Sequence, residues 1–327
     1  MNRRKLITLL GGAAATWPVV ARAQPADKVK LVTVMMVSEA DDPSYQARIV
    51  AFQQRLQDFG WTDGRNIRIH YSWVGRDTLR MRAAAKELVK LEPNVIVTTN
   101  TVSTQMVQQV TDTLSIVFAG GTDPLASGLV ASLAHPGRNV TGFSNFEFSL
   151  GAKWLELLRQ VAPGTKRVLV LTQPANDGNR GLFGTIQTAA SALAVKLSTA
   201  DVNDAIALER AVTEFSREPD GGLIILPLPS HTRDLILALA VQHKLPAIYP
   251  LRRFTQRGGL MSYGYDELQL WRGAASYVDK ILRGEKPGDL PVQHVTKFEL
   301  VLNLKTAKAL GLRISDSFLL LVDEVIE

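Results

Sequence analysis

The sequence predicts an α/β protein made of two lobes, each with three α/β/α layers around a parallel sheet. First, 327 residues exceed the length at which one hydrophobic core usually stops growing. Second, short apolar runs alternate with amphipathic helical segments, which is typical of parallel sheets covered by helices. Third, the same order of elements begins again after Pro163-Gly164. We therefore expect two similar lobes.

The composition indicates an ordinary folded protein. Hydrophobic residues make up 46% of the chain and charged residues 21%, close to the averages for globular domains. The chain contains no cysteine. This excludes disulfides, thiol catalysis, cysteine-type zinc sites and a lipid-modified N-terminal cysteine.

The net charge of +6 does not indicate a nucleic-acid partner. Of the 37 basic residues, four (Arg3, Arg4, Lys5 and Arg22) lie in the first 23 residues, which leaves 33 basic against 31 acidic residues in the rest of the chain. Basic and acidic residues alternate along most predicted helices, whereas a nucleic-acid surface gathers Lys and Arg on one face. We expect no nucleic-acid partner.

The first 23 residues have the pattern of a secretory signal peptide. A charged segment ends at Lys5, an apolar stretch runs over residues 6–20, and Ala21-Arg22-Ala23 has the small-x-small form of a cleavage site. The apolar stretch is too short to span a bilayer. Arg3-Arg4 resembles a twin-arginine signal, and the general secretory route stays open. Both routes lead out of the cytoplasm, so we expect a soluble periplasmic protein without a lipid anchor.

The first lobe is predicted from its alternating elements. Asp42-Pro43 offers a helix cap and a proline at the first helical position, and Gly60 ends that helix. Asn94–Thr98 is short and rich in β-branched residues, as expected of a strand buried on both faces. The predicted strands are 29–37, 67–73, 94–98, 115–118 and 139–142, and the predicted helices are 42–59, 79–91 and one from about 103.

The second lobe repeats the series after residue 163. Its predicted strands are 167–171, 195–199, 221–226, 246–249 and 259–263, and its predicted helices are 184–194, 205–217 and 234–243. A long helix over 266–283 follows, with Trp271, Ala274 and Val278 on one face, and a Gly/Pro-rich linker over 284–291 leads to residues 292–302. A short helix over 303–311 and a final segment to Glu327 complete the chain.

The long helix and the linker predict that the chain passes between the lobes three times, so that the lobes are joined by a hinge. The N-terminal lobe is expected to comprise residues 24–143 and 264–288. The C-terminal lobe is expected to comprise residues 144–263 and 289–327.

Several segments, in this order, resemble the ABC-substrate-binding family of ABC transporter substrate-binding proteins over nearly the full length. The segments that carry the resemblance are Met1–Lys5 with Thr8–Ala15, Asp123–Ala134, Pro136-Gly137, Asn139–Gly142, Leu245–Tyr249, Gly258–Gly264, Tyr277–Gly284, Thr296–Val301 and Asn303–Leu312. The resemblance implies the type I periplasmic binding protein fold, with two Rossmann-like lobes and a three-strand hinge.

What the resemblance implies for function is capture of a small molecule between the lobes and delivery to ABC permease subunits in the inner membrane. Relatives resemble receptors for amino acids, including aromatic ones, so an amino acid or a related small carboxylate is favoured. ATP hydrolysis would belong to a separate subunit, so no cofactor is expected, and we expect a monomer. The chain departs from many relatives over Met35–Glu39, which weakens transfer of any one relative's ligand.

The ligand of a parallel sheet lies beyond the carboxyl ends of its strands, so the loops there supply the candidate ligand-binding residues. Thr101 and Ser103 open a helix whose free N–H groups suit an anion, or they merely cap that helix. Asp123 pairs with a ligand ammonium or caps the next helix. The candidates from these loops are Ser38, Asn100, Thr101, Ser103, Thr122, Asp123, Asn176, Pro229 and Ser230.

An arginine and three aromatic residues complete the candidate site. Arg252 or its neighbour Arg253 could hold a carboxylate in bidentate fashion, and we assign this role to Arg252. Phe143, Phe254 and Tyr263 stack on an apolar part of the ligand or pack in the core.

The sequence gives no sign of catalysis. It lacks the recurrent hydrolase, phosphate-loop and dinucleotide motifs, and its five histidines have no metal-ligand spacing. A solute receptor is therefore the leading hypothesis. A ligand-sensing module for a membrane sensor kinase and an exported enzyme of unrecognised type are the alternatives.

Overall fold

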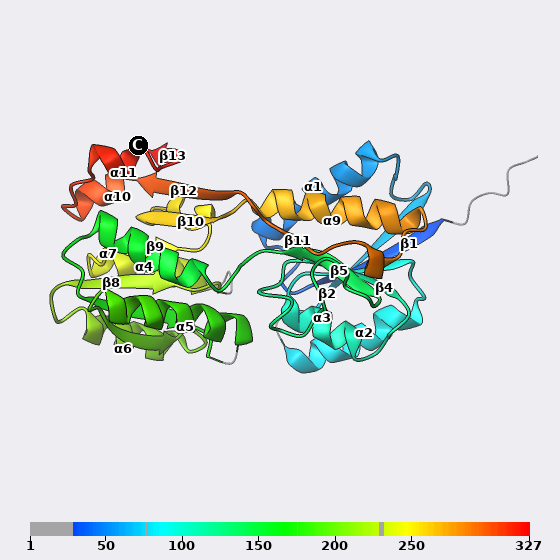
Figure 1. Cartoon of the computed structure of the whole chain (residues 1–327), viewed down its shortest axis with the longest axis horizontal. Coiled ribbons are helices and arrows are strands. Elements are labelled where there is room, and N and C mark those ends of the chain that lie inside the picture. The colour runs from blue at the N-terminus through cyan, green and yellow to red at the C-terminus, as the bar shows by residue number, and fades with distance from the viewer. Residues whose placement is uncertain (1–28, 76, 175, 229–231) are drawn as a thin grey trace, which may run out of the picture.

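The computed structural model consists of two α/β lobes that lie side by side (Figure 1). It describes residues 29–327 except 76, 175 and 229–231. The predicted signal peptide and the candidates Pro229 and Ser230 lie outside the described residues. The predicted fold class is confirmed: each lobe has a parallel or mainly parallel sheet between helices.

The first lobe contains a six-stranded parallel sheet of order β11-β5-β4-β3-β1-β2. Helices α1 and α9 pack on each other, and so do α2 and α3. Its strands are β1 (Lys30–Met36), β2 (Ile67–Trp73), β3 (Val95–Thr98), β4 (Ser115–Ala119), β5 (Val140–Ser144) and β11 (Gln293–His294). Its helices are α1 (Pro43–Asp58), α2 (Thr78–Lys90), α3 (Thr101–Gln108) and α9 (Glu267–Leu282).

The strands of the first sheet are buried on both faces, as their apolar runs predict. Val34 and Val97 belong to the cluster that includes residues of α1 and α9. Met35 and Ile96, one position away, belong to the cluster that includes residues of α2 and α3. Adjacent strand residues therefore pack in two different parts of the core, because side chains alternate between the two faces of a strand.

The second lobe contains a seven-stranded sheet of order β13-β12-β10-β9-β8-β6-β7. Its strands are β6 (Arg167–Thr172), β7 (Lys196–Asp201), β8 (Gly221–Ile225), β9 (Ala247–Tyr249), β10 (Met261–Tyr265), β12 (Phe298–Asn303) and β13 (Glu324–Ile326). Its helices are α4 (Leu150–Val161), α5 (Asp177–Ala192), α6 (Ala205–Phe215), α7 (Arg233–Gln242), α8 (Arg252–Thr255), α10 (Leu304–Ala309) and α11 (Asp316–Leu319). A 3₁₀ turn, η2, spans Pro287–Asp289.

The chain passes between the lobes after β5, after β10 and after β11. The third passage returns directly to the second lobe without a helix, so β12 enters the sheet from the end where β10 leaves it. β12 and β10 are consequently antiparallel. Gln293 of β11 pairs with Phe143 of β5, so the first sheet extends past residue 288, where we expected the first lobe to end.

Steric crowding explains why β5, the strand before the first passage between the lobes, contains a glycine at position 142. A Cβ atom at Gly142 would lie 2.2 Å from the Phe118 carbonyl oxygen of the neighbouring strand β4. Real Cβ atoms do not come so close, so only glycine fits at this position of β5.

Candidate functional site

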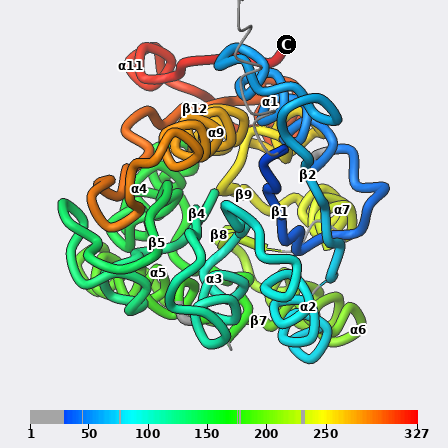
Figure 2. Tube along the Cα trace, turned by 90° about the vertical axis from the view of Figure 1, so that its right-hand side faces the viewer, coloured from blue at the N-terminus to red at the C-terminus, as the bar shows by residue number. Residues whose placement is uncertain are grey.

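The two lobes touch through the loops that follow their strands. A Cβ atom placed on Gly178, at the start of α5 in the second lobe, would lie 2.8 Å from Cβ of Thr122, which follows β4 in the first lobe. Figure 2 shows the elements of the two lobes overlapping when the molecule is viewed along its long axis. Since ligands of parallel sheets bind beyond the carboxyl ends of the strands, this is where we place the candidate site.

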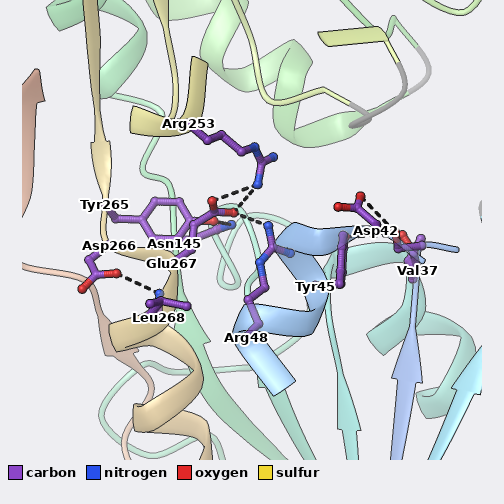
Figure 3. A network of polar contacts seen from close by, with 11 residues as sticks. Val37, Asp42, Tyr45, Arg48, Asn145, Arg253, Tyr265, Asp266, Glu267 and Leu268 are labelled. Atoms are coloured by element: carbon purple, nitrogen blue, oxygen red, sulfur yellow. Dashed lines mark hydrogen bonds and ion pairs between the residues drawn. The ribbon is translucent and has the colours of Figure 1, made fainter. Parts of the chain in front are cut away.

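A charged cluster joins the lobes beside the hinge (Figure 3). Nη1 of Arg253, on α8 of the second lobe, lies 2.8 Å from both carboxylate oxygens of Glu267, the first residue of α9. Arg48 of α1 pairs with the same carboxylate. We call Arg48, Asn145, Arg253, Tyr265 and Glu267 the inter-lobe network.

Local structure places Glu267 and Arg48 at this point. Glu267 stands in the first turn of α9, where the helix dipole favours a negative charge, and the preceding Asp266 caps the helix by accepting from the Leu268 N–H at 2.8 Å. The Arg48 guanidinium carbon lies 4.1 Å from the ring centroid of Tyr45, one helical turn earlier in α1.

Two neutral members attach the inter-lobe network to the hinge. Asn145 follows β5, and its Nδ2 donates to the Tyr265 hydroxyl oxygen at 3.0 Å. Its Oδ1 accepts from the Gly121 N–H at 3.2 Å. Two hinge passages and the loop after β4 are thus held by one asparagine.

The charges of the inter-lobe network control its pKa values. Burial opposes ionisation of Glu267, but Arg48 and Arg253 outweigh it and lower the pKa of the carboxyl. Burial likewise opposes the charge on Arg48, yet Glu267 outweighs it and raises the pKa of the guanidinium. Burial and then the Glu267 charge raise the pKa of Tyr265 to about 12. All three residues therefore keep their usual charge at neutral pH, and the network carries one net positive charge.

Arg253 has donors that the protein does not use. Its Nη1 donates to the carboxylate of Glu267, but its Nε is buried and has no hydrogen-bond partner. Among the described residues Nη2 donates no hydrogen bond either. The side-on edge of the guanidinium, formed by Nε–H and Nη2–H, therefore has no hydrogen-bond partner among the described residues.

Most polar candidates from the sequence satisfy backbone groups. Asn100 and Ser103 form a capping box on α3, with the Asn100 oxygen accepting from the Ser103 N–H at 2.7 Å. Thr101 accepts from the Thr122 N–H at 3.2 Å, Asp123 accepts from Ala126 N–H at 3.0 Å, and Asn176 accepts from Asn179 N–H at 3.3 Å. Asn100 and Asn176 therefore cap α3 and α5, whereas Asp123 bonds within a turn that no helix follows and Thr101 links two loops of the first lobe.

Ser38 lies on the first lobe, after β1. Its hydroxyl donates to the Asp42 carboxylate at 3.4 Å, just before α1. In the same stretch the Tyr45 hydroxyl donates to the Val37 carbonyl at 3.4 Å. Figure 3 shows these contacts on the opposite side of Arg48 from Glu267.

The other candidates face different surroundings. Arg252 pairs with Glu299 of β12 at 3.2 Å and with Glu324 of β13, towards the edge of the second sheet. Phe254 is buried and stacks on Tyr249, in accord with the core-packing interpretation.

The two remaining aromatic candidates also pack against neighbouring aromatic rings. Phe143 packs against Tyr277 of α9, with ring centroids 4.7 Å apart. Tyr263 stacks on Phe298 with ring centroids 5.7 Å apart.

Sequence reasoning missed Arg48, Asn145, Tyr265 and Glu267. Arg48 and Glu267 are 219 residues apart, and no local pattern joins them. The one available signal was the pair Arg252-Arg253, of which Arg253 contacts the inter-lobe network.

Two cavities lie elsewhere in the molecule. One of about 480 Å³ lies beside the hinge, with walls from α1, α9 and the passage from β11 to β12. The other, about 210 Å³ and mainly apolar, lies near the starts of β9 and β10.

The described part of the chain holds no acidic or histidine cluster able to bind a metal ion. Nor does any of its helices combine the length and apolar character needed to cross a membrane.

Comparison with known proteins gives consistent findings. The family model described as "ABC transporter substrate binding protein" matches residues 32–326. The chain is 26% identical over 293 residues to a "Tyrosine-binding protein" of Clostridioides difficile (strain R20291), which covers 88% of this chain and 83% of the relative.

Two solved structures share the fold with TM-scores of 0.81. A conserved domain protein from Vibrio cholerae is 27% identical and covers 91% of this chain and 100% of its own. An ABC domain in complex with L-Trp from Streptococcus pneumonia is 24% identical and covers 91% and 99%.

Proposed function

Because the chain belongs to the family of ABC transporter substrate-binding proteins, we propose that it captures an amino acid or a related small carboxylate between its lobes and delivers it to an ABC permease. The observation that carries the proposal is the meeting of both lobes, at the ends of their parallel strands, around a largely buried network with one net positive charge. Such a site favours a solute that carries a carboxylate group.

The relatives support this class of solute. One is named for binding tyrosine, and a structural neighbour was solved with L-Trp. The three hinge passages support a mechanism in which the lobes close on the solute and reopen at the permease. The chain would act as a binding protein, not as an enzyme.

The site of action follows from the same proposal. The signal-like residues 1–23 would direct export, by the twin-arginine or the general secretory route, and the mature protein would work as a soluble monomer in the periplasm. The permease subunits would be its protein partners in the membrane.

A thermal-shift screen tests the function. The mature protein, from Gln24 onward, is unfolded and refolded to remove any bound solute and is then heated with amino acids, small carboxylates, amides, purines and sugars. A ligand at a hundred times its dissociation constant should stabilise the fold by about 2.7 kcal/mol. We expect a selective shift with an amino acid or a small carboxylate. A selective shift with a sugar or a purine would contradict the proposed solute class.

A further inference from the structure

We infer that Arg253 selects the solute by its carboxylate, which it binds through the unpaired Nε–H and Nη2–H edge of its guanidinium. The inference rests on the proposed function and names the residue that gives the site its preference. It is carried by the pairing of Arg253 and by the contrast with Arg252.

The pairing leaves one edge of the guanidinium without a hydrogen-bond partner. Of the Arg253 nitrogens, only Nη1 donates to Glu267, and it lies 2.8 Å from each oxygen of the Glu267 carboxylate. Nε is buried without a partner, and a buried donor without an acceptor is costly. The two parallel N–H groups of this edge match the two oxygens of a carboxylate, so a bound carboxylate would satisfy them together.

The surroundings fix the guanidinium in place and keep its charge available. Only 17% of the Arg253 side chain is exposed, and Glu267 holds it from across the lobe boundary. Glu267 is itself paired with Arg48, so the two cations share one anion and one positive charge is left over. A carboxylate ligand would neutralise the remaining charge.

The adjacent arginine differs in its pairing: its Nε is likewise buried without a partner, but its Nη2, on the same edge, is already bonded to Glu324. Arg252 pairs with two carboxylates, Glu299 and Glu324, and its side chain is 38% exposed. Its charge is already balanced, and its partners belong to β12 and β13. Arg252 therefore provides a control variant on the same short helix.

The test combines variants of the protein with pairs of ligands. Calorimetry measures binding of L-tyrosine and L-tryptophan, and of their amides, in which the carboxylate becomes neutral. The wild type, Arg253→Gln, Arg253→Lys and Arg252→Gln are compared. We expect Arg253→Gln to lose about 100-fold in affinity for the amino acid, with less than a threefold change for the amide. Arg253→Lys should recover only part of the loss, and Arg252→Gln should bind like the wild type.

The results distinguish a failure of the proposed role of Arg253 from a failure of the proposed function. If Arg253→Gln lowers affinity for the amino acid and its amide equally, Arg253 only holds the lobes together and the inference is wrong. The same conclusion follows if the wild type binds both ligands equally well. If the wild type binds neither amino acid and no other carboxylate in the thermal-shift panel, the proposed function fails and the inference fails with it.

Discussion

At the residue scale, Glu267 is the central group of the interface between the lobes. It accepts from Arg253 of the second lobe and from Arg48 of the first, and 17% of its side chain is exposed. Removing one member of such a cluster leaves the others with uncompensated buried charge. The structure therefore makes Glu267 more important to stability than a surface glutamate.

We predict that Glu267→Gln lowers the free energy of unfolding by about 3 kcal/mol at pH 7. The folded pKa of Glu267 lies below its ordinary value near 4.5, so its contribution is complete above pH 4.5 and is lost as the pH falls through the folded pKa. The gap between wild type and variant should close in that acidic range. Urea unfolding at a series of pH values measures it.

A matched control for this prediction is Glu285→Gln. Glu285 is half-exposed and lies 3.8 Å from Lys280, so its substitution should cost less than about 1 kcal/mol. If both variants lose the same stability, or if the gap at Glu267 does not change with pH, the assigned role of Glu267 is wrong.

Which side chains pair with each other was the feature that the sequence predicted least well. The Arg252-Arg253 pair was visible in the sequence, but the partners of Arg252 lie 47 and 72 residues away and those of Arg253 lie 14 residues away. Only the fold decides which arginine meets which carboxylate. Capping residues such as Asn100 were easier to interpret, because a cap bonds to N–H groups within three residues.

At the scale of elements, the apolar strands were predictable and the polar helix starts were less so. Val95–Thr98 forms a buried strand as its β-branched residues predict, and Pro43 begins α1. Helix α5 begins at Asp177, seven residues before the predicted start. The prediction missed these residues because the first turns of the helix hold glycines and polar residues, which give no apolar helical pattern. The two-residue strand β11 has no pattern of its own and exists only through pairing with β5.

The start of α5 gives a prediction about lobe closure. Gly178 faces Thr122 across the lobe boundary, and a Cβ there would lie only 2.8 Å from Cβ of Thr122. We predict that Gly178→Val wedges the lobes apart and lowers solute affinity about tenfold or more, a cost of about 1.4 kcal/mol or more. Calorimetric titration with the solute identified by the thermal-shift screen measures it.

Gly184→Val is the control for this effect. Gly184 belongs to the same helix, but no atom lies within 4 Å of a Cβ placed on it. Both variants should have similar thermal stability, and Gly184→Val should bind as tightly as the wild type. Equal affinity in the two variants would show that the contact between Gly178 and Thr122 does not limit closure.

At the scale of the whole molecule, the repeated order of strands and helices was enough to predict two lobes. Their sheets contain six and seven strands, and three chain passages connect them. The exact end of the first lobe could not be predicted, since Gln293-His294 joins the first sheet only through long-range pairing. Likewise, the inter-lobe network brings together residues from α1, α8 and α9, which only the assembled lobes place side by side (Figure 3).

A crystal structure of the mature protein with its best amino-acid or carboxylate ligand tests whether the solute binds between the lobes at Arg253. We predict that the ligand lies between the lobes, with its carboxylate on the unpaired edge of Arg253 and with Arg253 still bonded to Glu267. Density for the ligand in the 480 Å³ cavity beside the hinge, with none between the lobes, would contradict the account.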